Sequence, residues 1–473
     1  MVRTPKGPMT TASETAHPAG FADTLAEHSL SASGGSMTTV AGPGALAALT
    51  GLIAHIAPEG EIVILSDGAP KTVAGSAVMD AVIAVLPAGR TARCLVAAES
   101  GHGVVLDETT IAEVSTRARG AAVVVSVGSG TVSDLGKVVA AAVSAPLISV
   151  QTAASVNGFA DPLSVVVVKG AKRTVPTLWP SALVIDHGLV AEAPAALTRA
   201  GVGDAVAIWS APADWYLACE IGMDPGRYDD RFVEPVKRIA PRLSDGSVTE
   251  ADRIAALIEV LTVGGLVIGD AGTTAPLSGV EHLVSHVLDM AAMAEDSPHD
   301  LHGAQVGVAS ILSAALWDIA LHEEKILDAD PADFAVPEGL RERVLATWAS
   351  CDPSGVLGEE CWSAVQKKMG RWNDEQPAVR AFFAERDRHR ARLDELAGDP
   401  AEPAAALALW GAPRTFLALT PAVSPERARW ALAALPFMRD RMSLADLLVL
   451  RGCWNDELFD RVFARAADVG GGL

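Results

Sequence analysis

Two histidines four residues apart, His282 and His286, are the side chains in this sequence best spaced to act together. Positions i and i+4 of a helix share a face, so both imidazoles are expected to point the same way. His302 and Asp204 extend the set. Imidazole and carboxylate together suit a divalent transition metal, and three protein ligands would leave positions open for catalysis. Because the chain has 11 histidines, chance could also produce the i,i+4 pair.

A second candidate site lies upstream, where an apolar run meets a glycine turn. Residues 121–127 are short, apolar and β-branched, which is typical of a strand buried on both faces. Residues 132–142 have the pattern of a helix, and between them lie Gly128, Ser129, Gly130 and Thr131. A strand, a glycine turn and a helix N-terminus suit a nucleotide phosphate, because free amides and the helix dipole face it. Without context the turn could equally be only a turn.

Five short motifs, in this order, resemble those of the metal-dependent alcohol dehydrogenase and dehydroquinate synthase superfamily. They are the glycine turn with Asp134 and Lys137 behind it, residues 152–158, Gly203-Asp204, the histidine pair preceded by Glu281, and His302-Gly303. Trp215 and residues 439–444 also resemble the sn-glycerol-1-phosphate dehydrogenase branch. The resemblance covers about residues 45 to 465. It implies a Rossmann-like nucleotide domain, an all-helical metal domain and an active site in the cleft between them.

The resemblance also implies roles for individual residues. It assigns one divalent metal ion to Asp204, His282 and His302, which leaves His286 near the substrate as a proton donor or relay. Zinc is the expected ion, with nickel and iron as alternatives. Helical geometry alone does not choose between the two histidines of the pair. Lys137 would reach the substrate, and Asn157 lies in a segment that faces it.

For the cofactor, NAD or NADP, the resemblance implies contacts along the carboxyl ends of the strands. The expected residues are Asp67, Gly128, Ser129, Gly130, Thr131, Asp134, Thr152 and Ser155. A carboxylate at the adenosine ribose repels a 2′-phosphate, so Asp67 in that place would favour NAD. Other interpretations stay open: Asp67 in solvent, Thr152 and Ser155 as turn caps, and Asp134 on an exposed first turn.

Three positions depart from the pattern of the superfamily. The chain has Ser129 where a third glycine is usual, Asn157 where an aspartate is common, and Ala304 where a glutamate usually follows His-Gly. Groups behind the ligands tune a metal site. These departures leave the fold expectation intact and put the substrate in doubt.

The elements that would position these residues are of two kinds. Strands and helices alternate up to residue 186, which predicts a parallel sheet with helices on both faces. The expected strands are 61–67, 93–98, 121–127, 146–150, 163–169 and 183–186, the run at 163–169 forming a hairpin that turns at Gly170; the expected helices are 46–56, 78–86, 109–118 and 132–142.

After residue 191 the strand signals fade and helical spacing prevails. Expected helices include 254–268, 305–322, 378–396 and 425–434, with loops at 331–337 and 398–403. We therefore predict three regions: a disordered or loosely attached N-terminal extension at 1–40, a nucleotide-binding α/β domain at 41–190, and a helical metal-binding domain at 191–473.

Composition excludes some classes of function. A formal charge of −21 argues against binding a nucleic acid backbone. No run of 18 uninterrupted apolar residues occurs, so we expect no membrane span. The five cysteines are scattered, without a CxxC pair, which favours a reducing cytoplasm. We also expect a homodimer or a higher homo-oligomer.

The resemblance implies reversible reduction of dihydroxyacetone phosphate to sn-glycerol 1-phosphate with NADH or NADPH. Alternatives are a dehydrogenase of glycerol or another polyol, a cyclase of the dehydroquinate synthase kind, and a nucleotide-binding protein with a degenerate site. A phosphorylated substrate needs cations in the cleft. Lys169, Lys172 and Arg173 are the candidates, and a basic hairpin tip in solvent is the alternative.

Overall fold

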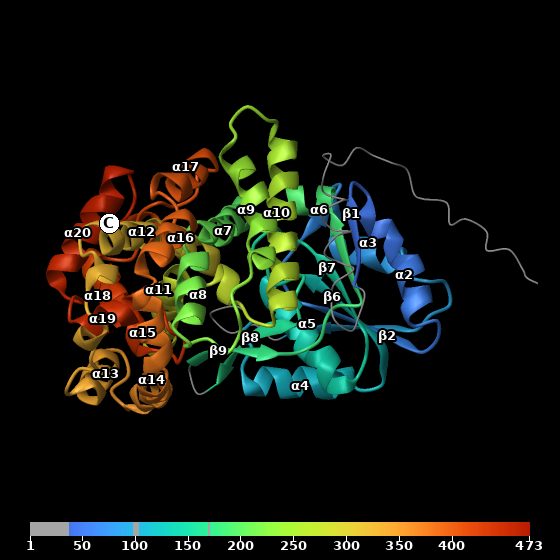
Figure 1. Cartoon of the computed structure of the whole chain (residues 1–473). Coiled ribbons are helices and arrows are strands. Elements are labelled where there is room, and N and C mark those ends of the chain that lie inside the picture. Colours follow the sequence, from blue (N-terminus) through green and yellow to red (C-terminus); the bar gives the residue numbers. More distant parts are fainter. Residues whose placement is uncertain (1–36, 98–103, 169–170) are drawn as a thin grey trace, which may run out of the picture.

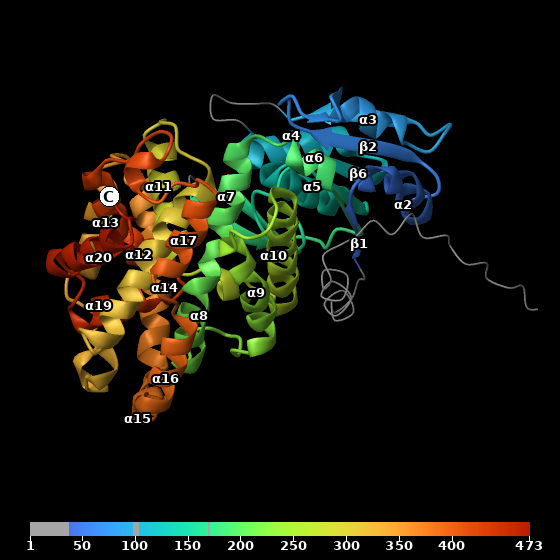
Figure 2. The ribbon, with the colours of Figure 1, turned by 90° about the horizontal axis from the view of Figure 1, so that it is seen from above.

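The computed structural model describes residues 37–97, 104–168 and 171–473. A sheet covered by helices forms one side of the molecule, and a helical part with the C-terminus forms the other (Figure 1). Helices α9 (Glu234–Ile239) and α10 (Glu250–Ala271) lie between them in both ribbon views (Figures 1 and 2). Most of the predicted N-terminal extension lies outside the described residues, as do Ala98, Lys169 and Gly170.

The predicted parallel sheet is confirmed. Its six strands pair in parallel in the order β1-β10-β7-β6-β2-β5. Their bounds are β1 (Thr38–Gly42), β2 (Glu61–Ser66), β5 (Ala92–Val96), β6 (Ala121–Gly128), β7 (Leu147–Gln151) and β10 (Ala182–Asp186). Gly128 pairs with Gln151, so the glycine turn and the segment after β7 start at the same edge.

Strand β1 corrects the predicted N-terminal extension. The sequence assigned residues up to 40 to that extension, yet Thr38, Thr39 and Val40 pair with β10 at the edge of the sheet. The strand is short and mostly only partly buried, so it lacks the apolar run that marks the central strands. Met37, just before it, is buried.

Alternation along the strands lets both faces of the sheet bury apolar side chains. Ile62 and Ile64 of β2 pack in a cluster with α2 (Leu49–Ile56) and α3 (Val78–Ala84). Val63 and Leu65 belong to the opposite cluster, with α4 (Glu108–Ala118) and α5 (Gly130–Val143). This two-sided burial explains why the central strands are continuously apolar.

Two small hairpins flank the sheet. The predicted hairpin is present as β8 (Leu163–Val168) paired with β9 (Ala171–Pro176) in antiparallel register. A second hairpin, β3 (Thr72–Val73) with β4 (Ser76–Ala77), was not predicted, because two-residue strands carry no periodic signal.

The all-helical character of the second half is also confirmed: among the described residues, no strand follows β10. Besides α9 and α10, its helices are α6 (His187–Ala191), α7 (Ala195–Ala205), α8 (Ala211–Glu220), α11 (Val280–Ala294), α12 (His302–His322), α13 (Leu340–Ala349), α14 (Val356–Asp374), α15 (Gln376–Ala384), α16 (Arg386–Leu396), α17 (Ala401–Leu409), α18 (Pro425–Ala434), α19 (Leu444–Arg451) and α20 (Asp456–Asp468). They enclose one large apolar core.

Two predictions in the helical half are wrong in detail. The expected helix 378–396 is two helices, α15 and α16, which meet at Glu385, the last cap of one and the first cap of the other. The expected loop 398–403 ends early, because α17 begins at Ala401. Pro403 lies in its first turn, where a helix has no use for the missing amide hydrogen.

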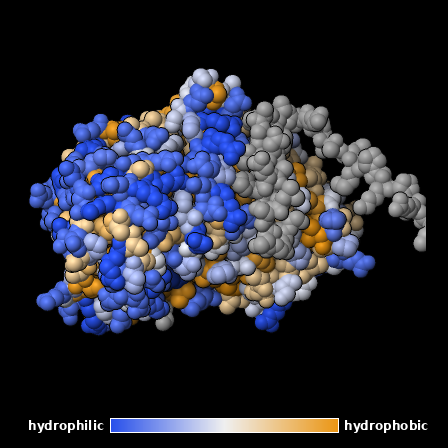
Figure 3. Space-filling view, viewed as in Figure 1, coloured by the Kyte–Doolittle hydropathy of each residue, from blue (hydrophilic) through white to orange (hydrophobic). Residues whose placement is uncertain are grey.

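Helices α10 and α12 are long and apolar enough to cross a membrane by length and composition. Their apolar windows are 78% and 94% buried inside the protein, as expected for core helices of a large helical domain. The surface of the helical part is mostly hydrophilic on the face shown in Figure 3. The test on uninterrupted apolar runs missed these two helices because single polar residues interrupt them.

Candidate metal and nucleotide site

Glycines let α7 and α12 approach closely enough to bring their polar side chains together. A Cβ on Gly203 would lie 1.9 Å from the carbonyl oxygen of Gly303, and a Cβ on Gly303 would lie 1.9 Å from that of Ala200. Only glycine therefore fits at either position of this crossing. Asp204 and His302, the chain neighbours of these two glycines, face each other as a result.

Asp204, His282 and His302 form the one group of three potential metal ligands found among the described residues. One ligand atom from each lies within 4.8 Å of the others. His282 Nε2 is 3.3 Å from Asp204 Oδ1, and His302 Nε2 is 3.9 Å from the same oxygen. Two ligands of a tetrahedral zinc ion lie about 3.3 Å apart, so the arrangement fits one such ion.

Each member of the group is oriented by a second contact. His282 Nδ1 is 2.9 Å from Glu281 Oε1, and Glu281 also accepts hydrogen bonds from Ser210 Oγ and the amide of Gly279. His302 Nδ1 lies 2.8 Å from Ser285 Oγ. Such contacts fix the ring and leave the other nitrogen free for a metal.

The third contact comes from the nucleotide half of the chain. Asp204 Oδ2 accepts a hydrogen bond from the amide of Asn157, 2.9 Å away. The segment that carries Asn157 packs directly on the helices, since a Cβ on Gly201 would lie 1.9 Å from the carbonyl oxygen of Ala154. Residues of both halves thus meet at the metal candidate.

Charges in this group are strongly coupled. Burial disfavours a charged imidazole, but hydrogen bonds to Asp204 and Glu281 outweigh it and raise the pKa of His282 to about 9. Burial and the charge of His282 lower the pKa of His302 to about 4. Burial would raise the pKa of Asp204, yet contact with His282 lowers it. A metal ion at these atoms would replace the proton on His282.

His286 lies one helical turn beyond the group on α11. Its ring centroid is 5.4 Å from that of His302, and it is not one of the three clustered ligands. Burial and nearby positive charges lower its pKa well below the ordinary value, so it is neutral at pH 7. A neutral imidazole carries one N–H and one bare nitrogen and can therefore pass on a proton.

The glycine turn has the predicted strand–turn–helix form, but the helix starts earlier than predicted. It begins at Gly130, not Val132, and no side chain caps it. A Cβ on Gly128 would lie 2.4 Å from Val132 Cβ, and one on Gly130 would lie 2.7 Å from Val156 Cγ2. The glycines are therefore needed for packing, while the first amides of the helix stay free for an anion.

Thr152 lies beside this turn, because its amide donates a 3.0 Å hydrogen bond to the carbonyl of Gly128. Thr152 and Ser155 are both buried. Ser129 precedes α5 and Thr131 lies in its first turn. The structure thus brings most of the predicted cofactor residues to one edge of the sheet.

Lys137 and Asp134 point into the protein interior, whereas the motifs predict them at the substrate and at the cofactor. Lys137 is fully buried, and its Nζ contacts Asp134 Oδ1 at 3.0 Å, Asp161 Oδ1 at 3.1 Å, the carbonyls of Gly158 (2.8 Å) and Leu163. Asp134 also accepts from the amide of Val165 at 3.1 Å. Both residues therefore fasten α5 to the segment after β7, and Asp134 is not on an exposed turn.

Asp67 follows the end of β2 and forms an ion pair with Lys71. Both side chains are partly buried, Asp67 at 16% exposure and Lys71 at 17%. Asp67 is therefore paired and partly shielded from solvent.

Two of the three basic hairpin residues, Lys172 and Arg173, are paired with acidic side chains, and Lys169 lies outside the described residues. Lys172 forms an ion pair with Asp289 on α11, and Arg173 forms one with Glu360 on α14 at 2.7 Å. The hairpin thereby joins the sheet part to α11, the helix that carries His282 and His286, and to α14.

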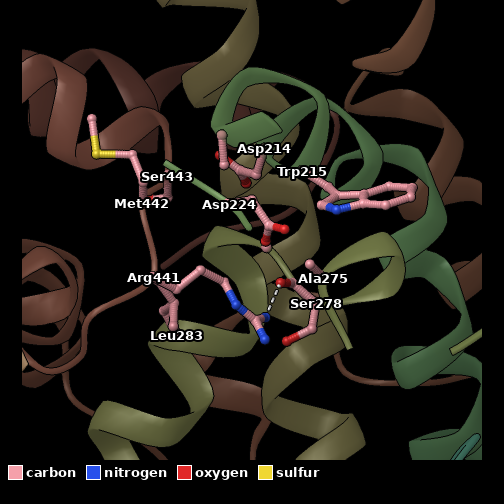
Figure 4. A pocket seen from close by; sticks show the side chains of 11 residues that line it. Asp214, Trp215, Asp224, Ala275, Ser278, Leu283, Arg441, Met442 and Ser443 are labelled. Carbon is pink, nitrogen blue, oxygen red and sulfur yellow. Dashed lines mark hydrogen bonds between the residues drawn. The ribbon is translucent and has the colours of Figure 1, made fainter. Parts of the chain in front are cut away.

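Two small cavities flank the histidine group. One is lined by Asn157, Asp204 and apolar residues of α9 and α10, so both halves contribute to it. The other lies at the start of α11, where the Arg441 side chain points toward Ser278 below Asp214 and Trp215 (Figure 4). Neither contains the three clustered ligands together.

The sequence did not identify two supporting residues of the site. The sequence motif contains Glu281 but assigns it no contact, and no motif indicates a role for Ser285. The signal for Glu281 was its position next to His282; Ser285 lies three residues after His282 and one before His286. The glutamate that is usual in the superfamily after His-Gly is replaced here by Ala304. Glu281 nevertheless supplies a buried carboxylate to the site.

Comparisons with known proteins agree with this geometry. The family model for iron-containing alcohol dehydrogenases matches residues 40–194. A glycerol-1-phosphate dehydrogenase (NAD(P)+) from Bacillus velezensis is 30% identical over 302 residues, covering 62% of this chain and 74% of that protein. The chain belongs to the glycerol-1-phosphate dehydrogenase branch of the iron-containing alcohol dehydrogenases. It is therefore an oxidoreductase, as the motifs predicted.

Other relatives extend the match. The enzyme of the same name from Bacillus subtilis is 32% identical over 269 residues, covering 55% of this chain and 68% of that protein. Glycerol dehydrogenase from Schizosaccharomyces pombe superposes with a TM-score of 0.55 over 92% of this chain and 91% of its own, at 15% identity. Maleylacetate reductase from Rhizobium sp. superposes with a TM-score of 0.53 over 91% of this chain and 96% of its own, at 18% identity. These structures show the shared fold.

Proposed function

We propose that the protein reversibly reduces dihydroxyacetone phosphate to sn-glycerol 1-phosphate, with NADH or NADPH as the hydride donor and one divalent metal ion. The reaction consumes one proton and one hydride per ketone. The single observation that carries the proposal is the hydrogen bond between Asn157 and Asp204, because it couples the nucleotide edge of the sheet to the candidate metal ligands. The names of the relatives supply the substrate and the cofactor.

The residues present fit a metal ion. Two imidazoles and a carboxylate converge, and both imidazoles are held by their other nitrogen. We assign Asp204, His282 and His302 as the ligands, with zinc as the expected ion and nickel or iron as alternatives. When bound, the metal would supply a Lewis acid for the carbonyl oxygen and the nicotinamide would supply the hydride.

The protein's own groups position the reactants and move the proton. The free amides at the start of α5 would hold the cofactor pyrophosphate, and Thr152 and Ser155 lie beside them. His286, neutral and next to His302, would pass a proton to the developing alkoxide. Close packing of α7 against α12 and against the carbonyl of Ala154 fixes the backbone that carries Asp204.

A dehydrogenase of glycerol or another polyol is the second candidate, and the side chains at two positions favour it. Asn157 and Ala304 stand where carboxylates are common in the superfamily, so contacts to substrate hydroxyls would differ. The lining of the cavity beside Asp204 includes Asn157, which supports a role for this residue in discriminating between substrates.

Purified protein supplied with each metal in turn tests the proposal. Oxidation of NADH in proportion to added dihydroxyacetone phosphate would support the dehydrogenase, and it would exclude a cyclase that regenerates its cofactor. Stereospecific assay of the product would distinguish the sn-1 from the sn-3 isomer. Turnover of glycerol but not of the phosphorylated ketone would favour the second candidate.

Elemental analysis tests the metal assignment. Protein purified without added metal should contain about one equivalent per chain, in line with the single cluster found, and the His302→Ala variant should contain much less. Equal metal content in both would remove His302 from the site.

We further propose a cytoplasmic location and a homodimeric or larger homo-oligomeric assembly. All five cysteines are unpaired, which supports a reducing compartment. The assembly rests on the resemblance alone, and the mass in solution would test it.

A further inference from the structure

Arg439 is a partly buried arginine in the loop that precedes α19, and the structure shows no partner for its charge. Among the described residues, no hydrogen bond or ion pair is formed by its guanidinium. Three basic residues of the same region do have partners: Lys172 pairs with Asp289, Arg173 pairs with Glu360, and Arg441 donates to Ser278 and Thr274. Removing an arginine even partly from water without a counter-charge is unfavourable, so its position needs an explanation.

The loop that carries Arg439 is held firmly. Lys368 Nζ contacts the carbonyl of Pro436 at 2.8 Å and Asp446 Oδ1 at 2.5 Å, and so fastens both ends of the loop. Arg371 Nη2 donates to the carbonyl of Asp440 at 2.9 Å. The guanidinium of Arg439 is therefore presented by a braced backbone.

The same loop is bonded to the beginning of α11, the helix of His282 and His286. Arg441 Nη1 donates to the carbonyl of Ser278 at 2.9 Å, the contact drawn in Figure 4. Asp214 bridges the two segments, since its carboxylate accepts from the amides of Leu444 and Val280 at 2.8 and 3.0 Å. Arg439 is thus held beside the metal-bearing helix.

Electrostatics agree with this placement. Burial lowers the pKa of Arg439 to about 9, and the charge of Arg441 adds to this effect. The positive charge of Arg439 in turn contributes to the low pKa of His286, after burial and His302. The positive charge of Arg439 thus acts on His286, the proposed proton-relay residue, and Asp440 opposes the effect of Arg441 on Arg439 itself.

We infer that Arg439 binds the phosphate group of the substrate and so determines the preference for a phosphorylated ketone. The inference rests on the proposed function. A guanidinium offers a planar pair of N–H donors that matches two phosphate oxygens, and the phosphate supplies the missing counter-charge. The sequence suggested Lys169, Lys172 and Arg173. Of these, Lys172 is paired with Asp289 and Arg173 with Glu360, and Lys169 lies outside the described residues.

The test compares three variants of the full-length, metal-loaded enzyme: R439Q, R439K and R173Q. R173Q is the matched control, because it removes an arginine charge from the same region but one that Glu360 already balances. R439Q should lose roughly 100-fold in kcat/KM for dihydroxyacetone phosphate, as expected for two charge-assisted hydrogen bonds. R439K should recover part of the loss. The KM for NADH should not change.

Inorganic phosphate is the equilibrium probe. It should bind the wild-type enzyme–NADH complex and inhibit competitively with the ketone, while R439Q should bind it at least about tenfold more weakly. Equal effects of R439Q and R173Q, or unchanged phosphate binding in R439Q, would overturn the inference. If R439Q fails to fold, R439K decides: phosphate binding as tight as in the wild type would refute the paired-donor contact.

Failure of the proposed function can be told apart from failure of this inference. If the wild-type enzyme does not reduce dihydroxyacetone phosphate, the reaction assignment is wrong. Arg439-dependent binding of inorganic phosphate would then still establish an anion site, whereas its absence would refute the inference as well.

Discussion

The main-chain amide of Asn157 donates a hydrogen bond to the carboxylate of Asp204, 2.9 Å away. Because the donor is backbone, the contact does not depend on the unusual side chain at position 157. The carbonyl of the next residue, Gly158, accepts from the buried Nζ of Lys137 at 2.8 Å. Lys137 therefore acts on the metal candidate through the segment it holds, as a positioning residue.

The Lys137→Met variant tests this. It leaves Asp134 and Asp161 buried without their cation, which should cost about 3–5 kcal/mol of unfolding free energy. The remaining folded protein should also bind metal more weakly, because Asp204 loses its oriented partner. Metal titration of the folded fraction is the deciding measurement. Unchanged affinity would limit Lys137 to a structural role.

Glu281 is expected to strengthen metal binding through His282. Glu281→Gln keeps the size of the side chain but removes the charge that faces Nδ1 of His282, 2.9 Å away. Loss of such a contact typically weakens metal binding 10–100-fold. Competition with a chelator measures the change. Ser285→Ala, which removes an uncharged partner of His302, should have a smaller effect; the reverse order would contradict this account.

The glycine crossing of α7 and α12 should not tolerate a methyl group. Gly203→Ala places a Cβ 1.9 Å from the carbonyl oxygen of Gly303, so the helices must separate and Asp204 must move from His302. We expect an unfolding free energy lower by roughly 1–3 kcal/mol and a loss of bound metal.

Gly370→Ala is the matched control for this prediction. Gly370 lies in α14, and its Cβ would meet nothing within 4 Å. This replacement should stabilise the protein by up to about 1 kcal/mol, because alanine is the better helix former. Equal destabilisation by both replacements would show that the crossing has no special requirement for glycine.

Lys71 should influence the choice between the two cofactors. At the adenosine ribose, Asp67 would favour NAD, because a carboxylate there repels a 2′-phosphate. In the structure the ion pair with Lys71 offsets that charge. Lys71→Ala should therefore lower kcat/KM for NADPH relative to NADH, whereas Asp67→Ala should do the opposite. Identical ratios in all three proteins would place this pair away from the cofactor.

Continuous and periodic patterns of apolar residues allowed the sheet and the helical half to be predicted from the sequence. The β-branched runs of β2, β6 and β7 are buried on both faces and so read directly as central strands of a parallel sheet. Edge strand β1 and the break at Glu385 escaped because their residues lack a periodic signal. Spacing suggested the histidine group, but only the close approach of Gly203 and Gly303 shows why Asp204 joins it.

The cost of burying charge could not be predicted from the sequence. Lys137 looked like a residue that reaches the substrate, yet its Nζ contacts oxygen atoms of four residues around α5 and β8. Arg439 formed part of a family motif, and only its missing partner distinguishes it from Arg441. Such differences depend on tertiary contacts that no local spacing encodes.

The pair His299–Asp289 predicts a pH dependence of stability. The hydrogen bond to Asp289, 3.0 Å away, outweighs burial and raises the pKa of His299 above its ordinary value. A raised folded-state pKa stabilises the protein fully below the unfolded pKa, about 6.5, and this contribution is lost as pH rises through the folded value. Chelator-treated wild type should therefore lose stability relative to His299→Asn between pH 6 and 9, by an amount on the order of 1 kcal/mol.

Denaturant unfolding at several pH values measures the difference in unfolding free energy between the two proteins. Asp204, His282 and His302 are present in both, so their own titration contributes equally and drops out of the difference. His55→Asn, on the exposed side of α2, is the control and should show no such trend; a difference that grows toward acid pH would give the wrong sign and refute the pairing.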